Sequence, residues 1–427
     1  PADTYVGNCE PNQILASVQQ HKDHARSDAS LYLFGHGDGG GGPTERHLEF
    51  LRRGRLTSCY PEVLQGKKAI DFYQDAYAKS KDLAVWVGEL YLEYHRGTYT
   101  SQAKNKKFNR QSEFLLRDAE YLSCFTPDFP KGYPAADLEA AWKLVLLNQF
   151  HDIIPGSSVR EVYVDSDRDY AMVIDSGTKI VESAIKKIGS KLNTLGMQRP
   201  YALFQNAHFP GLGSIPWNEE EVPQSLNTKD ESLPVQLVEE FGERKLIFPT
   251  PSAALGAVTI GDLRDDAPGS RFRLKASNTN RKLENAFFAV KFDPQGNITS
   301  ITSLEDNSEF VAPGELANVF QLFDDKPLFW SAWDIDPFAL ETGKNLLRCT
   351  RFEIVERGPV RVTAEVERVF GNSRIIQRIS LGPQPMIFFD TQIDWHEEDK
   401  MLKVAFPVNV NAHRATYEIQ FGNVERP

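Results

Sequence analysis

A glycine-rich loop with a single carboxylate is the first segment whose side chains could do chemistry. The loop, GHGDGGGGPT (35–44), follows the apolar run LYLF (31–34), which we expect to be a strand, and contains Asp38 as its one acidic residue. Glycine lets a backbone approach a ligand closely, and open α/β sheets bind ligands where parallel strands end. Asp is also common in tight turns, where it accepts hydrogen bonds from nearby backbone. The spacing leaves both roles open for Asp38.

Gly35, Gly37 and Gly40 of this loop also match the G-x-G-x-x-G pattern of dinucleotide-binding turns. That fold requires further βαβ units, whereas the sequence from residue 67 onward has a helical pattern. No Gly-Lys-Ser/Thr is present, which excludes a P-loop. We therefore do not interpret the loop as a nucleotide site.

A second segment, LLNQFHDIIPGSS (146–158), places His151 and Asp152 directly after an apolar helix that we expect to end at Phe150. Imidazole and carboxylate groups are ligands of zinc and related divalent ions. A histidine at a helix end can instead cap the last carbonyl groups. Adjacent residues do not share one helix face, so any further metal ligands would come from elsewhere in the chain.

A third segment, WVGELYLEYHRGTYTSQAKNKKFNR (86–110), is dense in aromatic and polar side chains. Aromatic faces with nearby hydroxyls and carboxylates suit sugars, which combine apolar C–H faces with many hydroxyl groups. The alternative is an ordinary helix start whose aromatic side chains belong to the core.

These segments lie within a chain that divides into three regions with different patterns of apolar residues. Residues 1–62 mix helix and strand signals, residues 67–193 have apolar residues at helical spacing, and residues 199–427 alternate with the period of β-strands. We predict a multidomain protein: a small α/β part, a helical bundle, and large antiparallel β-sandwich domains. The sequence lacks an initiator Met and stops just after a strand-like run, so we expect a piece of a longer protein.

Composition narrows the class of function. The 427 residues carry a net charge of −11, which argues against nucleic acid and anionic membranes as partners. No apolar run approaches the roughly 18 residues of a membrane span. The four cysteines (Cys9, Cys59, Cys124 and Cys349) are scattered, which favours reduced thiols over a zinc site or disulfide framework.

Taken in order, these segments resemble the glycoside hydrolases of family 38, and most closely the cytosolic and vacuolar class of α-mannosidases. The matching stretches are GHGDGGGGPT, GELYLEYHRGTYTSQAKNKKFNR, NQFHDIIPGSS, LENAFFAVKFDPQGNITSI (283–301) and QLFDDKPLFWSAWDID (321–336). The resemblance implies that residues 1–62 are the tail of a parallel α/β catalytic domain. It also implies a retaining mechanism, in which one carboxylate attacks the sugar and a second carboxyl group acts as acid and then base.

The resemblance also implies roles for single residues. His151 matches the histidine ligand of one divalent metal ion, zinc or cobalt. Asp152 matches the neighbouring aspartate that contacts substrate hydroxyls or orients the site. Asp38 matches an aspartate in the loop that carries the acid/base, although other classes have two consecutive aspartates where this chain has Asp38-Gly39. Tyr99 and Thr100 would line or support the pocket.

The family's further metal ligands and its nucleophilic aspartate lie N-terminal to the glycine loop, in segments that this chain does not match. Either those segments belong to the same molecule, or this piece is inactive alone. The expected substrate is a terminal α-linked mannose of an oligosaccharide; the alternative is a catalytically incomplete carbohydrate-binding or scaffold fragment. The resemblance further implies a homo-oligomer, located in the cytoplasm or the vacuole.

Overall fold

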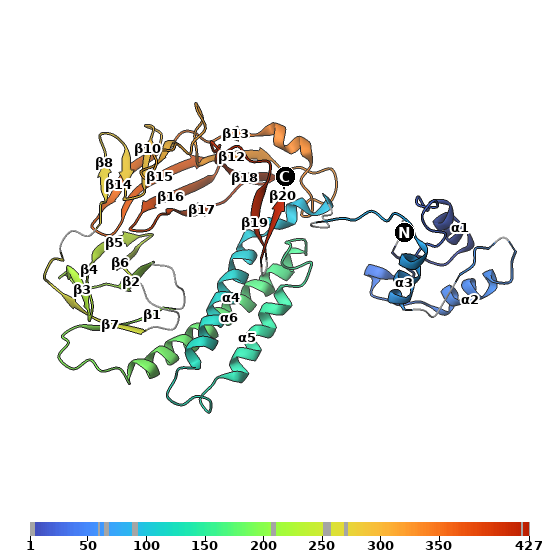
Figure 1. Ribbon diagram of the computed structural model, residues 1–427, viewed down its shortest axis with the longest axis horizontal. Helices are drawn as coiled ribbons and strands as arrows, with labels where there is room; N and C mark the ends of the chain where they lie inside the picture. The colour runs from blue at the N-terminus through green and yellow to red at the C-terminus, as the bar shows by residue number, and fades with distance from the viewer. Residues whose placement is uncertain are drawn as a thin grey trace. The chain divides into compact units, whose positions relative to one another are not determined.

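A computed structural model of the chain describes residues 5–58, 60–63, 68–87, 93–205, 211–250, 258–268, 272–419 and 422–426. These residues form two compact units (Figure 1). One unit lies within Pro1–Leu90 and Thr416–Arg426, and the other within Tyr91–Ala415. Each unit is described by itself below.

The first unit contains short helices around a small apolar core. Its elements are α1 (Pro11–Gln19), the 3-10 turn η1 (Gly37–Gly39), α2 (Glu45–Gly54), α3 (Ala69–Lys79), and the strands β19 (Ala415–Ile419) and β20 (Gly422–Arg426), which form a two-stranded sheet. Cys9, Ile14 and Leu51 are the buried residues of the core, and Tyr32 and Phe34 pack against them. This packing fixes where the glycine loop begins.

The strand expected at residues 31–34 is reduced to one parallel bridge between Gly7 and Phe34. Gly7 donates to the carbonyl of Leu33 at 3.1 Å, and Gly35 donates to the carbonyl of Gly7 at 3.0 Å. A strand persists only where partner strands take up its N–H and C=O groups. Among the described residues, the segment around Gly7 is too short to pair with more than this bridge.

The second unit begins with a three-helix bundle, as the helical spacing predicts. It follows the 3-10 segment η2 (Glu93–Tyr99) and consists of α4 (Ala103–Ser123), α5 (Ala135–Asn148) and α6 (Arg160–Gly189), which lie side by side in Figure 1. Leu116 of α4, Val145 of α5 and Val173 of α6 meet in its buried core. The helical region was expected from residue 67, but the structure groups α3 with the first unit, so the bundle starts at α4.

Antiparallel strands make up the rest of the second unit. They are β1 (Pro200–Phe204), β2 (Leu212–Pro216), β3 (Ser225–Thr228), β4 (Ser232–Pro234), β5 (Gln236–Glu240), β6 (Glu243–Pro249), β7 (Val258–Arg264), β8 (Lys275–Ser277), β9 (Lys282–Glu284), β10 (Phe288–Phe292), β11 (Ile298–Ser303), β12 (Val319–Asp324), β13 (Lys344–Asn345), β14 (Arg351–Arg357), β15 (Val362–Phe370), β16 (Ser373–Leu381), β17 (Ile387–Asp394) and β18 (Lys400–Ala405). A further 3-10 segment, η3 (Pro337–Thr342), lies between β12 and β13.

These strands form two successive sandwiches, which confirms the expected β-sandwich architecture. In the first sandwich, sheet β1-β7-β3-β4 faces sheet β2-β6-β5 across a core that includes Leu226, Phe248 and Leu263. In the second, sheet β11-β10-β9-β8 faces sheet β14-β15-β16-β17. A third sheet, β13-β12-β18, adjoins it. The alternation of inward and outward side chains that the sequence shows is the physical basis of both cores.

The two sandwiches are joined by buried contacts. Val238 of β5 and Ile247 of β6 pack against Val360, which precedes β15. The Gln236 side chain accepts hydrogen bonds from the backbone N–H groups of Val360 and Arg361, both at 2.8 Å. Buried polar groups are costly unless they are paired, so these bonds fix one orientation of the sandwiches.

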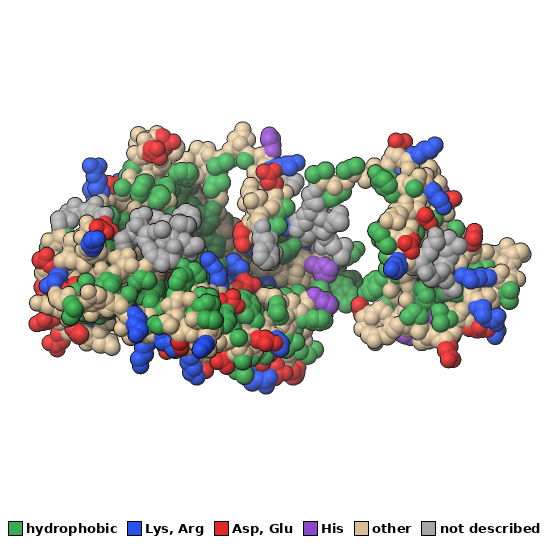
Figure 2. Space-filling view, turned by 60° about the horizontal axis from the view of Figure 1, so that its bottom comes forward, with side chains coloured by type: hydrophobic (Ala, Val, Ile, Leu, Met, Phe, Trp, Pro, Cys, Tyr) green, Lys and Arg blue, Asp and Glu red, His purple; other side chains and the backbone are tan. Residues whose placement is uncertain are grey.

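Charged side chains of both signs are interspersed over the surface shown in Figure 2. That face therefore carries no broad field of one sign. Within the part of the chain that the structure describes, no helix has the length and apolar character needed to cross a bilayer.

Candidate active site

The glycine loop of the first unit is a compact turn that holds Asp38 at its tip. His36 donates to the carbonyl of Gly41 at 2.8 Å and closes the loop. Gly40 has a positive φ of 68°, a conformation that a residue with a Cβ adopts at a cost. The loop is followed directly by α2, whose first turn is capped by His47: its Nδ1 accepts from the Thr44 backbone N–H at 3.0 Å. The helix thus anchors one end of the loop.

The Asp38 carboxylate accepts a hydrogen bond from the Tyr5 hydroxyl at 2.7 Å. This bond and the negative charge of Asp38 raise the pKa of the Tyr5 phenol, which therefore stays protonated and remains a donor. Asp38 itself is exposed. Its carboxylate reaches Tyr5 in the N-terminal segment, and this arrangement leaves the carboxylate accessible to a ligand.

The His151–Asp152 segment of the second unit is also a tight turn. The α5 helix ends at Asn148, two residues before the expected end at Phe150. His151 Nε2 lies 3.3 Å from Asp152 Oδ2, and 78% of the His151 side chain is exposed. The Asp152 carbonyl accepts from the Ser158 hydroxyl at 2.8 Å. The backbone of the turn is therefore fixed while the imidazole remains accessible.

Lys106 of α4 ties this turn to the segment that carries Tyr99 and Thr100. Its ammonium group donates to the carbonyl of Ser101 at 2.6 Å and to the carbonyl of Ile154 at 2.7 Å. Burial lowers the pKa of Lys106 to about 8. Two backbone carbonyl groups thus share one cation, which holds the two segments together.

Gly156 makes the second contact between these segments. Its φ is +90°, and a Cβ at this position would lie 2.5 Å from the Ser101 carbonyl oxygen. Real Cβ atoms do not approach an oxygen so closely. Glycine is therefore required here both by conformation and by space.

Residues 330–336, far along the chain, contact the segment that carries Tyr99 and Thr100. Arg96 binds the Asp334 carboxylate with Nε–Oδ1 at 2.9 Å, and this hydrogen bond holds the pKa of Asp334 below its usual range. Gly97 donates to the Trp333 carbonyl at 2.9 Å. The Ser101 hydroxyl lies 3.0 Å from the Ala332 carbonyl oxygen. Ser101 therefore contacts both of the other segments.

The structure thus brings four of the five predicted site residues into connected segments. Tyr99, with 54% of its surface exposed, and Thr100 lie directly before Ser101, while His151 and Asp152 lie in the turn that Lys106 and Gly156 attach to it. Asp38 lies in the first unit. Part of the aromatic segment at 86–110, residues 88–92, lies outside the described residues.

The described residues supply one metal-ligand candidate rather than a full set. His151 offers an exposed imidazole next to a carboxylate, an arrangement in which a carboxylate orients a ligating ring. Within the described ranges, however, no group of three or more His, Cys, Asp or Glu side chains is placed to hold a metal ion. These residues therefore do not by themselves fit a complete metal site.

Sequence reasoning missed the residues that join the segments. Lys106 is one of three lysines in KNKK (104–107) and Gly156 follows Pro155, and neither was singled out from the sequence. The available signal was their presence inside two of the motifs. Neither motif taken alone indicates that the two motifs touch, because their contact depends on how α4 and α5 pack.

Comparisons with known proteins agree with this architecture. The Glycosyl hydrolases family 38 N-terminal domain matches residues 1–89, the Alpha mannosidase middle domain matches 93–188, and the Glycosyl hydrolases family 38 C-terminal domain matches 283–427. The chain belongs to glycoside hydrolase family 38. The resemblance inferred from its motifs is thereby confirmed.

Similar proteins carry α-mannosidase names. The chain is 34% identical over 435 residues to "Alpha-mannosidase 2C1" of Homo sapiens, with all of this chain and 40% of that protein covered. It is 31% identical over 466 residues to "Alpha-mannosidase G" of Dictyostelium discoideum, again over all of this chain and 42% of that protein. This member of family 38 thus spans about 40% of the length of the curated relatives it matches.

Two solved structures from Enterococcus faecalis share the fold. One, described as an α-mannosidase, has a TM-score of 0.74 at 16% identity and covers 97% of this chain and 55% of its own. The other, described as a protein of glycosyl hydrolase family 38, has a TM-score of 0.71 at 16% identity, with 97% of this chain and 56% of its own covered. At this identity the likeness concerns the fold.

Proposed function

We propose that this chain is part of a retaining, metal-dependent α-mannosidase that removes terminal α-linked mannose from oligosaccharides. Membership of family 38 supports the class of reaction. The observation that carries the proposal is the junction at Ser101, where the segments of Tyr99 and Thr100, of His151 and Asp152, and of Ala332 are joined. Three motifs far apart in sequence converge there, as parts of one site would.

Asp38 is proposed as the acid/base. In the first step its carboxyl group would protonate the oxygen of the departing sugar, and in the second its carboxylate would take a proton from the attacking water. Its exposed position at the loop tip is compatible with access to a substrate. The nucleophilic carboxylate is not assigned to a residue of this chain.

His151 is proposed as one ligand of a divalent zinc or cobalt ion, which would supply positive charge for the sugar hydroxyls and the transition state. Asp152 is proposed to orient the imidazole, because its carboxylate lies 3.3 Å from Nε2. The remaining ligands would come from outside the described residues. Tyr99 and Thr100 are proposed to line the sugar pocket.

The test is hydrolysis of an aryl α-mannoside by the full-length protein, with and without a chelator. Chelator-sensitive turnover that returns with zinc or cobalt is the expected result. Absence of turnover with either metal added would overturn the proposal and favour a carbohydrate-binding or scaffold protein. Two further parts of the proposal, a homo-oligomer and a cytoplasmic or vacuolar location, are checked by light scattering and by cell fractionation.

A further inference from the structure

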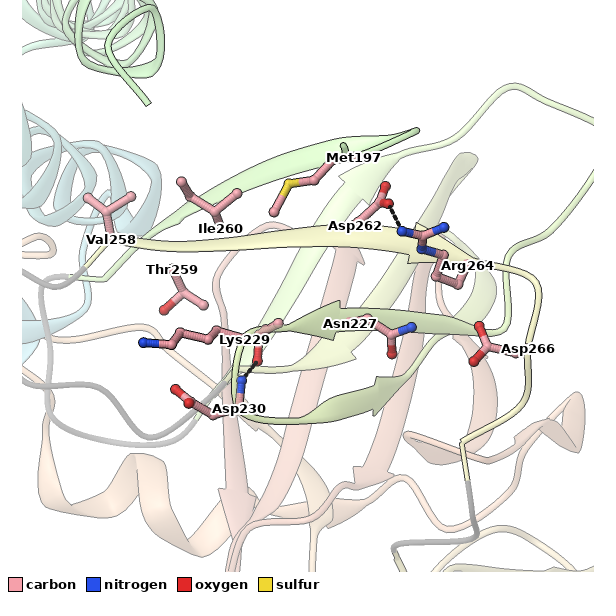
Figure 3. A pocket seen from close by; sticks show the side chains of 11 residues that line it. Met197, Asn227, Lys229, Asp230, Val258, Thr259, Ile260, Asp262, Arg264 and Asp266 are labelled. Carbon is pink, nitrogen blue, oxygen red and sulfur yellow. Dashed lines mark hydrogen bonds and ion pairs between the residues drawn. The ribbon is translucent and has the colours of Figure 1, made fainter. Parts of the chain in front are cut away.

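The outer face of the first sandwich carries an open groove of about 900 Å³ (Figure 3). Its floor is formed by β7 and β3, and one rim is formed by the segment around Met197. The volume lies within the range of small-molecule sites, about 300–1,000 Å³. The groove shares no residue with the segments around His151.

Strand register explains why polar side chains gather there. Asn227 pairs with Asp262, and Ser225 pairs with Arg264, across β3 and β7. Paired residues of an antiparallel sheet point to the same side, while the neighbouring Leu226 and Leu263 point into the core. The same alternation puts Ile260 on the outer side, so the floor combines an amide, charged groups and an apolar surface.

Asp262 is fully engaged by the protein itself. Its carboxylate accepts from the backbone N–H of Gln198 at 3.0 Å and of Arg199 at 2.6 Å, and it binds Arg264 at 2.7 Å. These bonds hold the segment that brings Met197 over the groove. Arg264 is 36% exposed, so its guanidinium group, which has five N–H donors, keeps donors available to a ligand.

Asn227 lies at the groove, but its side-chain oxygen is buried and has no hydrogen-bond partner among the described residues. A buried oxygen is closed to a ligand in the groove. The groups open to a ligand are therefore the Arg264 guanidinium and the carboxylate of Asp266, which is exposed. Lys229 and Asp230 lie at the turn after β3, and Asp266 follows β7.

We propose that this groove binds a saccharide unit of an oligosaccharide. Hydroxyl groups both donate and accept, so they can accept from Arg264 and donate to Asp266, while Ile260 and Met197 contact the C–H face of a sugar ring. An anion is disfavoured because three aspartates face two cations in the groove. A metal ion is disfavoured because the Asp262 carboxylate is already occupied by N–H donors.

The experiment is a titration of the whole 427-residue chain with a linear α-linked manno-oligosaccharide, followed by calorimetry and by saturation-transfer NMR. Saturable binding is expected. Arg264→Gln and Asp266→Ala should each weaken it at least about fivefold, since each removes a hydrogen-bond partner. Arg244→Gln is the matched control, because Arg244 is exposed on β6 in the other sheet of the same sandwich. It should leave binding unchanged.

Thermal unfolding of each variant separates loss of binding from loss of folding. Ile260→Lys supplies a second, independent block of the floor and should also abolish binding. No saturable binding to the wild-type chain, or equal binding by the groove variants and the control, would overturn the proposal. So would binding of inorganic phosphate, lost in Arg264→Gln, without binding of saccharide. Binding that persists in His151→Ala would show that the groove is separate from the proposed active site. If the proposed function failed, the proposal for the groove would therefore be unaffected.

Discussion

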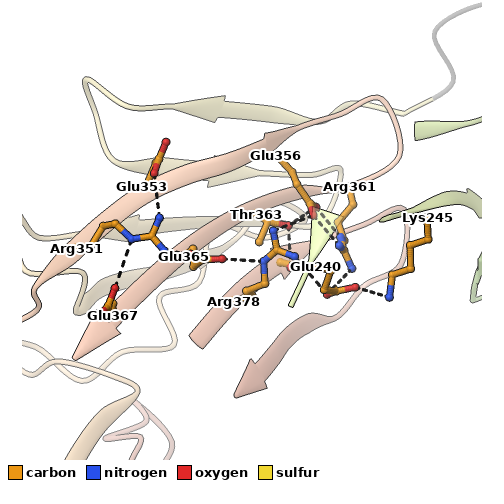
Figure 4. A network of polar contacts seen from close by, with 11 residues as sticks. Glu240, Lys245, Arg351, Glu353, Glu356, Arg361, Thr363, Glu365, Glu367 and Arg378 are labelled. Carbon is orange, nitrogen blue, oxygen red and sulfur yellow. Dashed lines mark hydrogen bonds and ion pairs between the residues drawn. The ribbon is translucent and has the colours of Figure 1, made fainter. Parts of the chain in front are cut away.

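Arg361 donates two parallel hydrogen bonds to the Glu356 carboxylate, Nε to Oε2 and Nη2 to Oε1, both at 2.7 Å (Figure 4). Only 9% and 5% of the two side chains are exposed. Arg361 also lies 3.4 Å from Glu240, which belongs to the other sandwich and binds Lys245 at 2.7 Å. The pair is therefore the centre of a buried charge network that spans both sandwiches.

Replacing Glu356 with Ala should destabilise the second unit strongly, because it leaves the Arg361 charge buried without its main partner. Breaking a buried pair in this way costs about 3–5 kcal/mol. Denaturant unfolding measures the shift. Asp175→Ala is the control, since the Asp175–Lys179 pair on α6 is 64% and 70% exposed, and exposed pairs contribute about 0–1 kcal/mol. Equal shifts for both variants would contradict a central role for the network.

Gly156→Ala should loosen the His151 turn. The added Cβ meets the Ser101 carbonyl, and the positive φ is unfavourable for alanine, so we expect a loss of about 1 kcal/mol or more. The measurement is hydrogen exchange of the backbone amides at 150–158, which should become faster in the variant. Gly189→Ala is matched to it, because a Cβ at Gly189 has no atom within 4 Å. Unchanged exchange in Gly156→Ala would show that the turn does not depend on this contact.

The lowered pKa of Lys106 predicts how the stability of the protein depends on pH. Burial lowers its pKa from 10.5 to about 8. Between these values the unfolded chain binds the proton and the folded chain does not, so the free energy of unfolding rises with pH across this window. Below about pH 8 both states are protonated, and the cost of burying the charge is present in full.

The measurement compares unfolding midpoints of the wild type and Lys106→Met from pH 7 to 10. The wild type should gain stability relative to the variant as the pH rises. Lys107→Met, at an exposed neighbouring position, should show no such difference. A wild-type profile parallel to that of Lys106→Met would exclude a lowered pKa for Lys106.

His151→Ala in the full-length protein should abolish metal retention and hydrolysis together. Elemental analysis after gel filtration measures the bound zinc or cobalt. His396→Ala is a suitable control, because His396 is also exposed and also pairs with a carboxylate, that of Asp394, at 2.8 Å. Normal metal content and turnover in His151→Ala would remove His151 from the set of metal ligands.

Asp38→Asn should affect substrates according to their leaving groups. An amide cannot donate the proton that a sugar leaving group requires, so hydrolysis of oligosaccharides should fall about 10²–10⁴-fold. Activated aryl mannosides need no such proton and should lose much less in the first step. Comparison of kcat/KM for the two substrates is the readout. Equal losses would indicate that Asp38 only shapes the loop.

Local patterns in the sequence determined the kinds of elements and their order. Apolar spacing indicated α4, α5 and α6, and alternation indicated the strands of the sandwiches, because both periods follow from backbone geometry within a few residues. The order of the motifs identified the family. The same local information failed at residues 31–34, where strand formation depends on partners elsewhere in the chain.

Only the tertiary structure decided which motifs meet. Ser101 contacts Gly156 and Ala332, which lie 55 and 231 residues further along the chain, and no local pattern encodes such a pairing. The contact arises because the bundle and the segment at 330–336 pack in one particular way. Residues such as Lys106 and Gly156 acquire their roles from that packing, since their neighbours in space are not their neighbours in sequence.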